Sequence, residues 1–282
     1  MRISHYEPGI MPTVLSDQPK RSRSYDPNIL RGGIYNTMVM PRTVSIRLIN
    51  PSLIDAILPI FKNVNHEELY NPDKQLSYFI KDYSSERGYQ KGEILLDYMR
   101  KFKERSRVGS DLRHEDMEFR DVALIKFAYF PQIGEHTRTH VLLVLSNERV
   151  FNYFSSVLYE KIREMSEDAF PFKKLFFTFT SSNENDVRNA FDDILKIRGE
   201  DVIDDVITDL SVRGARLYES FEYQKAYTGE IRYLGLQIGN NWFIVNRNGR
   251  ITTYRSLSDD DLIGFVREII LRLDSANAII EG

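Results

Sequence analysis

The side chains in this chain that could do chemistry are few. The chain has no cysteine, which excludes disulfides, thiol nucleophiles and Cys-ligated zinc. His136 and His140 have the spacing that brings two imidazoles together on one face of a helix. Their neighbours predict a strand instead, in which four residues separate the rings by roughly 13 Å, too far for one metal ion. We therefore expect no metal and no cofactor.

Two clusters contain carboxylates that could act as acid or base. His114-Glu115-Asp116 falls in a charged segment, and Asp259-Asp260-Asp261 falls where a helix is predicted to begin, so the helix dipole stabilises it. General acid–base work needs two carboxyl groups held in different environments, and neither pattern provides that. The glycine-containing loops do not match a phosphate-binding motif. No catalytic residue is assigned, and an enzyme ranks third among the classes of function.

Basic residues could bind phosphates in two segments. The formal charge of −3 argues against binding of nucleic acid by the whole surface, so any such contact must be local. A basic patch over residues 100–113 and a basic run near the N-terminus predict the alternative function, binding of RNA or single-stranded DNA. The residues of this site are Lys20, Arg21, Arg23, Arg100, Lys101, Lys103, Arg105, Arg107 and Arg113.

Residues 1–42 form an unusual N-terminal segment, which we call the arm. It contains five of the ten prolines, which rule out a helix or a central strand there. It is nevertheless richer in large apolar residues than a disordered tail. The pattern predicts an extended arm that packs on a neighbouring subunit. The side chains expected in that interface are Tyr6, Ile10, Met11, Val14, Leu15, Tyr25, Ile29, Leu30, Tyr35 and Met38.

The central segment, residues 43–182, is predicted to be an α/β core domain. Apolar periodicity, helix caps and Pro131 define the elements strand 43–49, helix 51–62, strand 122–130, strand 138–145, helix 148–165 and strand 173–180. This β-α-β-β-α-β order is that of ferredoxin-like folds. Residues 66–118 would be a helical insertion, because Leu95, Met99 and Phe102 have helical spacing.

The last segment, residues 183–282, is predicted to hold two helices, an antiparallel meander and a closing helix. The helices are expected to end near Gly199 and Gly214, and the closing helix to begin at Ser258. The strands of the meander are predicted at 215–225, 231–238, 242–245 and 250–254. Asn248-Gly249 between two apolar runs predicts a type I′ hairpin turn. The expected fold class is therefore α+β.

Composition and the arm together favour one class of function. Hydrophobic residues make up 42% and charged residues 28% of the chain, as in soluble globular proteins, and no apolar run approaches the length of a membrane span. We expect a soluble, intracellular (cytoplasmic) protein without a membrane partner. The leading hypothesis is a non-catalytic structural subunit that forms homo-oligomers or binds neighbouring subunits, of the kind found in virus or phage assemblies.

Overall fold

The computed structural model describes residues 40–281, apart from residues 63–64, 87, 109–110, 134–137, 164–169 and 203–208. Contacts within the chain divide it into Met1–Met38 and Val39–Gly282. The arm interface residues and the basic residues Lys20, Arg21 and Arg23 therefore lie outside the described residues. The predicted domain boundary between residues 182 and 183 stays a prediction.

Strands dominate the described part of the chain. They are β1 (Arg42–Ile49), β2 (Glu67–Asn71), β3 (Leu76–Glu86), β4 (Tyr89–Val108), β5 (Asp111–Ile133), β6 (Arg138–Val144), β7 (Phe172–Phe177), β8 (Asp193–Glu200), β9 (Asp209–Arg213), β10 (Glu230–Ile238), β11 (Asn241–Asn246), β12 (Arg250–Thr253) and β13 (Ile279–Glu281). The α-helices are α1 (Ile54–Lys62), α2 (Glu148–Ile162), α3 (Glu184–Ala190), α4 (Phe221–Ala226) and α5 (Asp259–Ser275). Two short 3-10 helices, Pro51–Leu53 and Leu217–Glu219, complete them.

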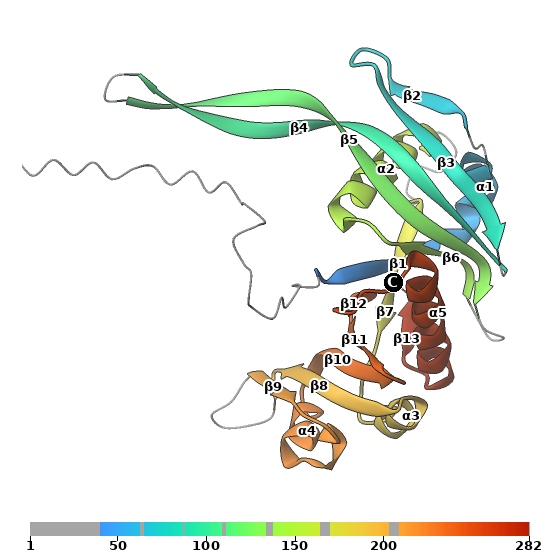
Figure 1. The fold of residues 1–282 in the computed structure, drawn as a ribbon, viewed down its shortest axis with the longest axis vertical. Helices are drawn as coiled ribbons and strands as arrows, with labels where there is room; N and C mark the ends of the chain where they lie inside the picture. The colour runs from blue at the N-terminus through green and yellow to red at the C-terminus, as the bar shows by residue number, and fades with distance from the viewer. Residues whose placement is uncertain are drawn as a thin grey trace, which may run out of the picture. The chain divides into compact units, whose positions relative to one another are not determined.

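All described strands join one antiparallel network, in the order β2-β3-β4-β5-β6-β1-β12-β11-β10-β8-β9, with β7 and β13 branching from β1 (Figure 1). The prediction of a ferredoxin-like α+β layer with a helical insertion and one closing helix is therefore wrong. The six elements occur in the predicted order, but β1 pairs with β6 and β12, and the predicted insertion supplies β2, β3, β4 and the first part of β5.

Strand β1 connects the two halves of the sheet. Its first residues pair with β12, its later residues pair with β6 on one side and with β7 on the other. Val44 and Ile46 are fully buried, as expected for a strand in the middle of a sheet. Arg47 is also buried, and it forms an ion pair with Glu148 at the start of α2.

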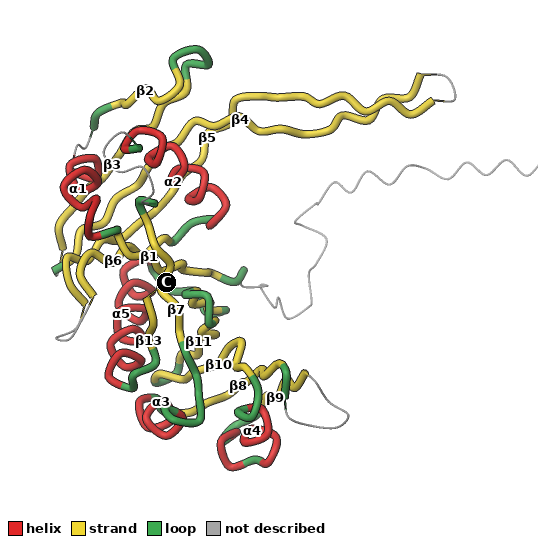
Figure 2. The backbone as a smooth tube through the Cα atoms, turned by 180° about the vertical axis from the view of Figure 1, so that it is seen from behind, coloured by secondary structure: helices red, strands yellow, loops and turns green. Residues whose placement is uncertain are grey.

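Helices cover the two halves of the sheet separately, and two cores result. Helices α1 and α2 pack over β3, β4 and β5, where Phe61 meets Phe127 edge-on at 5.1 Å between ring centroids (Figure 2). Helix α5 packs against the C-terminal strands and contributes a buried stripe that includes Leu262, Val266 and Ile270. No described helix is long and apolar enough to cross a membrane.

The helix expected at residues 95–105 is strand β4. Leu95, Met99 and Phe102 do have helical spacing, but Ile94, Leu96 and Tyr98 also alternate with period two. The strand pattern prevails because β4 pairs with β5 continuously from Gln90↔Tyr129 to Val108↔Asp111. Strand β5 also continues past Pro131 to Ile133. Strand β4 no longer pairs with it there, so the N–H that proline lacks is not required.

The C-terminal half contains further corrections. The helix that begins after Asn183 ends at Ala190, and the expected remainder up to Gly199 is strand β8, paired with β10. The next predicted helix lies partly outside the described residues, and its end is strand β9. Residues 215–225 form the 3-10 helix and α4 rather than a strand. The strands at 231–238, 242–245 and 250–254 and the closing helix with its Ser258 N-cap are confirmed.

Candidate protein-interaction site

The far half of the β4–β5 hairpin is a two-stranded ribbon, residues 98–108 and 111–121, which we call the ribbon (Figure 1). Strand β3 pairs with β4 only as far as Leu96, and β6 pairs with β5 only from Phe127 onward. In the ribbon the outer backbone edges of both strands therefore have no neighbouring strand in the described part of the chain. Open edges of this kind are templates for pairing with another chain.

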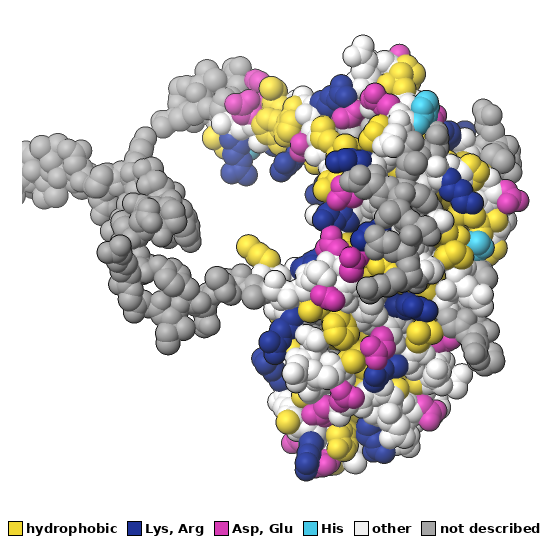
Figure 3. Space-filling model, turned by 45° about the vertical axis from the view of Figure 1, so that its right-hand side comes forward, with side chains coloured by type: hydrophobic (Ala, Val, Ile, Leu, Met, Phe, Trp, Pro, Cys, Tyr) yellow, Lys and Arg dark blue, Asp and Glu magenta, His cyan; other side chains and the backbone are white. Residues whose placement is uncertain are grey.

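The two faces of the ribbon differ in chemistry. Residues directly opposite each other share a face, so Phe102 and Met117 lie together, and Phe119 lies beside them. We call this the aromatic face. Its side chains remain exposed by 43%, 41% and 41%, although the rings of Phe102 and Phe119 meet at 5.5 Å. Figure 3 shows hydrophobic side chains gathered along this ribbon.

The opposite face of the ribbon carries cross-strand ion pairs. Lys101 donates to Glu118 at 2.8 Å, and Lys74 of the β2–β3 turn reaches the same carboxylate at 3.2 Å. Hydrogen bonds from these two lysines lower the pKa of Glu118. Arg100, on the aromatic face, lies 3.7 Å from Asp121. The acidic residues of β5 therefore offset much of the positive charge predicted to bind nucleic acid.

The remaining predicted phosphate ligands do not converge. Lys103 and Arg105 are exposed on the ribbon and form no ion pair within the described residues. Arg107 and Arg113 belong to β4 and β5, but the structure does not describe their side chains. The basic residues of the predicted site whose side chains can be placed all belong to β4, and Arg100 and Lys101 among them line the groove between the ribbon and α2.

A buried carboxylate fixes the base of the ribbon. Asp97 is 8% exposed and accepts hydrogen bonds from the backbone N–H of Ser77 at 3.1 Å and from its hydroxyl at 3.0 Å. Arg120 donates to the same carboxylate oxygen at 2.5 Å. Burial raises the pKa of Asp97, but these hydrogen bonds more than offset that effect and the pKa lies below its ordinary value.

A groove of about 820 Å³ separates the ribbon from the first turns of α2. Tyr98 and Phe102 line it on the ribbon side, and Arg149 and Tyr153 line it on the helix side. The rings of Tyr98 and Tyr153 lie 6.0 Å apart, and the Tyr98 hydroxyl donates to Asp121 at 3.0 Å. The aromatic face thus borders a hollow that is open to a partner and is not filled by the chain's own described side chains.

Charge divides the ribbon by strand. Residues 98–108 of β4 contain five Lys or Arg and one Glu, whereas residues 111–121 of β5 contain five Asp or Glu and two Arg. One edge of the ribbon is therefore basic and the other acidic. The sequence contains this signal, but the predicted helix assigns its basic residues to the outer face of that helix and its acidic residues to a charged loop.

Histidines do not form a metal site in the described part of the chain. His140 shares a hydrogen bond with the hydroxyl of Tyr129, while His136 is outside the described residues. No group of three or more Asp, Glu or His side chains could hold a metal ion among the residues described.

Comparison with known proteins gives no family. No protein-family model matches the chain, and no curated protein matches its sequence.

Proposed function

We propose that this chain is a structural subunit that associates with further copies of itself through the ribbon. The observation that carries the proposal is the exposed aromatic face on a ribbon whose outer edges have no partner. Two-stranded hairpins are marginally stable in water, and exposed apolar patches mark interaction surfaces. A partner that covers Phe102, Met117 and Phe119 would stabilise the ribbon and remove this apolar surface from water.

Charge complementarity favours a second copy as the partner. Pairing of two β4 edges would bring Lys103 and Arg105 against the same residues of the neighbour, and pairing of two β5 edges would oppose Glu115 and Asp116. Pairing of one copy's β4 with another's β5 instead brings basic residues against acidic ones. Such an interface is heterologous, and it produces rings if the rotation closes and filaments if it does not.

The arm is a second segment that we propose to contribute to subunit association. The support for this role comes from the sequence. Its large apolar residues and prolines suit an extended segment that binds a neighbouring subunit. Deletion of residues 1–39 separates its contribution from that of the ribbon, since the described strands begin only at Arg42.

Light scattering after size-exclusion chromatography tests the proposal. We expect the full-length chain to give a mass above its monomer mass of 33.1 kDa, and Phe102→Ser with Phe119→Ser to shift it to the monomer. The matched control is Phe221→Ser, which removes an aromatic ring that is 71% exposed on α4. A monomer at about 100 µM protein, where even micromolar association would show, or an unchanged mass in the double variant, would refute the ribbon interface.

Charge exchange tests which edges meet. The variant Lys103→Glu with Arg105→Glu makes residues 103–105 of β4 acidic, like residues 115–116 of β5. The variant Glu115→Lys with Asp116→Lys makes residues 115–116 of β5 basic, like residues 103–105 of β4. Each variant alone is expected to remain monomeric. An equimolar mixture is expected to associate, because the acidic β4 edge of the first variant then faces the basic β5 edge of the second. Association of either variant alone, with none in the mixture, would contradict the β4–β5 pairing.

A further inference from the structure

The C-terminal strands turn one face to the core and the other to solvent. Ile197, Leu234, Val245 and Ile251 are fully buried on the core face. The residues that alternate with them, or lie beside them, form what we call the basic sheet face. It consists of Lys196, Arg198, Arg213, Arg232, Tyr233, Trp242, Asn246, Arg247, Arg250 and Tyr254.

Strand register places these side chains in rows across the sheet. In one row Arg213 is opposite Lys196, which is opposite Gly235. In the next row Arg198 is opposite Tyr233, and Tyr233 is opposite Asn246. Since directly opposite residues share a face, cations and an aromatic ring lie side by side on adjacent strands.

The basic sheet face has an excess of positive charge. Six Lys or Arg side chains belong to it, and the acids beside them are Glu148, Glu200, Asp209 and Glu230. Glu148 pairs with Arg250, and Glu230 pairs with Arg247. Arg198 lies 3.2 Å from Glu200, which also pairs with Arg232. Lys196 and Arg213 form no ion pair within the described residues. This local excess on a chain of formal charge −3 is complementary to a polyanion.

The two unpaired cations lie against aromatic rings. The Lys196 ammonium is 5.0 Å from the Tyr233 ring centroid, and the Arg213 guanidinium is 5.7 Å from the Trp242 ring. Trp242 in turn stacks on Tyr254, with centroids 5.4 Å apart and planes at 15°. Tyr254 is 43% exposed. Flat rings beside cations are the groups that proteins use to stack unpaired bases and hold the adjoining phosphates.

A trough of about 760 Å³ extends this surface toward β7 and β13. Arg198, Arg232 and Arg247 line it together with Tyr233 and Asn246, and so do Glu200 and Glu230, with which these arginines form ion pairs. The trough therefore offers charged donors, a ring and an amide within one hollow, which suits a backbone phosphate and a base edge.

Gly235 lies in the middle of the face, buried beneath its neighbours. A Cβ at this position would lie 2.7 Å from the Cβ of Lys196, closer than real contacts allow. The glycine thus lets the lysine side chain lie close to the strand, beside Tyr233. A glycine within a strand is also typical of a place where another backbone or a ligand approaches closely.

We propose that the basic sheet face binds single-stranded nucleic acid. Lys196, Arg198 and Arg213 would contact phosphates, and Trp242, Tyr254 and Tyr233 would stack against bases. A single strand fits better than a duplex, because stacking requires unpaired bases. This site lies on other strands than the ribbon. It therefore differs from the nucleic-acid site that the sequence predicted at residues 100–113.

Intrinsic fluorescence tests the site in the unaltered, full-length protein. Trp242 is the only tryptophan of the chain, so its emission reports on this face alone. We expect a 12-nucleotide oligouridylate to quench the fluorescence of Trp242. An oligothymidylate of the same length tests single-stranded DNA, and a 12-base-pair duplex serves as the comparison. Binding of the single strands should weaken steeply as salt is raised, because phosphate contacts release counterions.

Charge reversal then identifies the contacts. In fluorescence anisotropy with labelled oligouridylate, Lys196→Glu with Arg213→Glu is expected to weaken binding at least about tenfold. It should also reduce the slope of log K against log salt by about 1.4, from two lost phosphate contacts. Arg267→Glu, an exposed position of α5 away from this face, is the matched control and should leave affinity within about twofold.

Several results would overturn the proposal. One is absence of quenching and of an anisotropy change at about 50 mM salt and 100 µM protein, conditions under which even non-specific binding is seen. Others are equal affinity for duplex and single strand, or equal loss in the Arg267→Glu control. A loss caused by Lys103→Glu with Arg105→Glu, but not by the sheet-face variant, would place binding on the ribbon. If the sheet-face variant fails to fold by circular dichroism, quenching of the unaltered protein and its reversal by salt still decide the question.

Discussion

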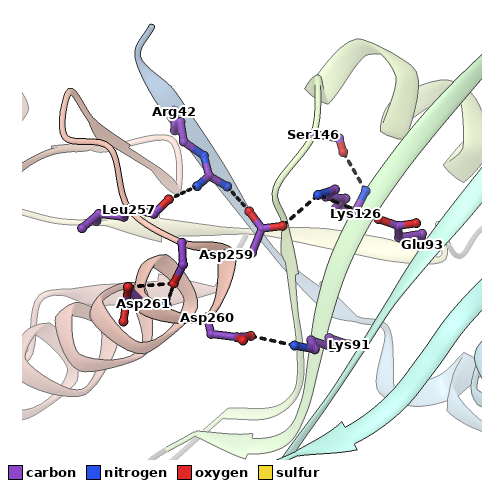
Figure 4. A network of polar contacts seen from close by, with 10 residues as sticks. Arg42, Lys91, Glu93, Lys126, Ser146, Leu257, Asp259, Asp260 and Asp261 are labelled. Atoms are coloured by element: carbon purple, nitrogen blue, oxygen red, sulfur yellow. Dashed lines mark hydrogen bonds and ion pairs between the residues drawn. The ribbon is translucent and has the colours of Figure 1, made fainter. Parts of the chain in front are cut away.

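Lys126 of β5 donates a hydrogen bond from Nζ to Oδ2 of Asp259 at 2.9 Å, and this contact joins the sheet to the first turn of α5 (Figure 4). Asp259 also pairs with Arg42 of β1, whose guanidinium donates to the carbonyl of Leu257 at 2.6 Å. One carboxylate thus connects three segments that are distant in the sequence. The neighbouring Asp260 extends the network to Lys91 of β4 at 2.8 Å.

Removal of the Asp259 charge is expected to destabilise the protein at neutral pH. Burial raises the pKa of Asp259, but hydrogen bonds from Lys126 and Arg42 more than offset it, so the pKa lies below its ordinary value. We expect Asp259→Asn to lower the free energy of unfolding by about 1 kcal/mol at pH 7, from partly exposed ion pairs and the helix dipole. Urea denaturation measures the loss.

The loss of stability caused by Asp259→Asn is expected to depend on pH. Because the folded pKa is depressed, the contribution of Asp259 is fully present above the unfolded pKa of about 3.9 and is lost as pH falls through the folded pKa. The difference between variant and unaltered protein should therefore shrink below about pH 4. Asp55→Asn is the control, because it removes an exposed first-turn carboxylate of α1 for which no ion pair is found in the described part of the chain. An equal loss in both variants would assign the effect to the helix dipole alone.

Asp97 is expected to matter more for stability than the exposed acids of the ribbon. Asp97→Ala would leave the buried N–H of Ser77 and the guanidinium of Arg120 without this acceptor, while the Ser77 hydroxyl keeps Glu67, at a cost of about 2 kcal/mol. Asp121→Asn, which alters a surface acceptor of the Tyr98 hydroxyl, should cost less than about 1 kcal/mol. Thermal and urea unfolding of the two variants provide the comparison, and equal losses would show that Asp97 does not fix the base of the ribbon.

Local signals predicted the elements where they were strong. Asn147 and Ser258 accept hydrogen bonds from the first turns of α2 and α5, as N-caps do, and both helices were expected at these starts. The Asn248-Gly249 hairpin was also expected, although only Gly249 has positive φ, so the turn is not type I′. Each of these features depends on a few neighbouring residues.

The type of the remaining elements depends on pairing between strands that are distant in the sequence. A single sequence does not show which strands pair. Residues 95–105 fit a helix and a strand equally well by spacing, and the 19 cross-strand pairs with β5 select the strand. Ile194 and Ile197 similarly fit the end of a helix until β10 supplies their partners. Consequently the ribbon, which exists only as a pair of strands, could not be found from either strand alone. The basic sheet face also required the register of five strands.

Two glycines of the C-terminal hairpins are expected to differ in their sensitivity to substitution. Both have positive φ, +74° at Gly249 and +55° at Gly239, so alanine strains the backbone at each. At Gly249 an added Cβ would also lie 2.0 Å from the carbonyl oxygen of Leu175, whereas at Gly239 nothing lies within 4 Å. We expect Gly239→Ala to cost about 1 kcal/mol and Gly249→Ala at least about 3 kcal/mol. Chemical denaturation measures both, and similar losses would contradict the close contact between β7 and the β11–β12 turn.

Two buried phenols predict a loss of stability at alkaline pH. Tyr223 is fully buried and Tyr227 nearly so, with ring centroids 4.9 Å apart, and burial raises the pKa of both. A raised folded pKa means that stability is full below the unfolded pKa of about 10 and falls as pH rises above it. At one pH unit above that value, ionisation of each phenol in the unfolded chain should lower the free energy of unfolding by about 1.4 kcal/mol.

The variant Tyr223→Phe with Tyr227→Phe removes both hydroxyl groups, and neither has a hydrogen-bond partner in the described part of the chain. Since replacing buried polar groups by apolar ones of the same shape is nearly neutral or stabilising, we expect its unfolding free energy at pH 7 to be unchanged or up to about 1 kcal/mol higher. Between pH 9 and 11 it should lose about 2.7 kcal/mol less than the unaltered protein. Urea denaturation across this range tests the prediction, with the exposed Tyr254→Phe as control. An identical alkaline loss in the double variant would mean that other groups cause it.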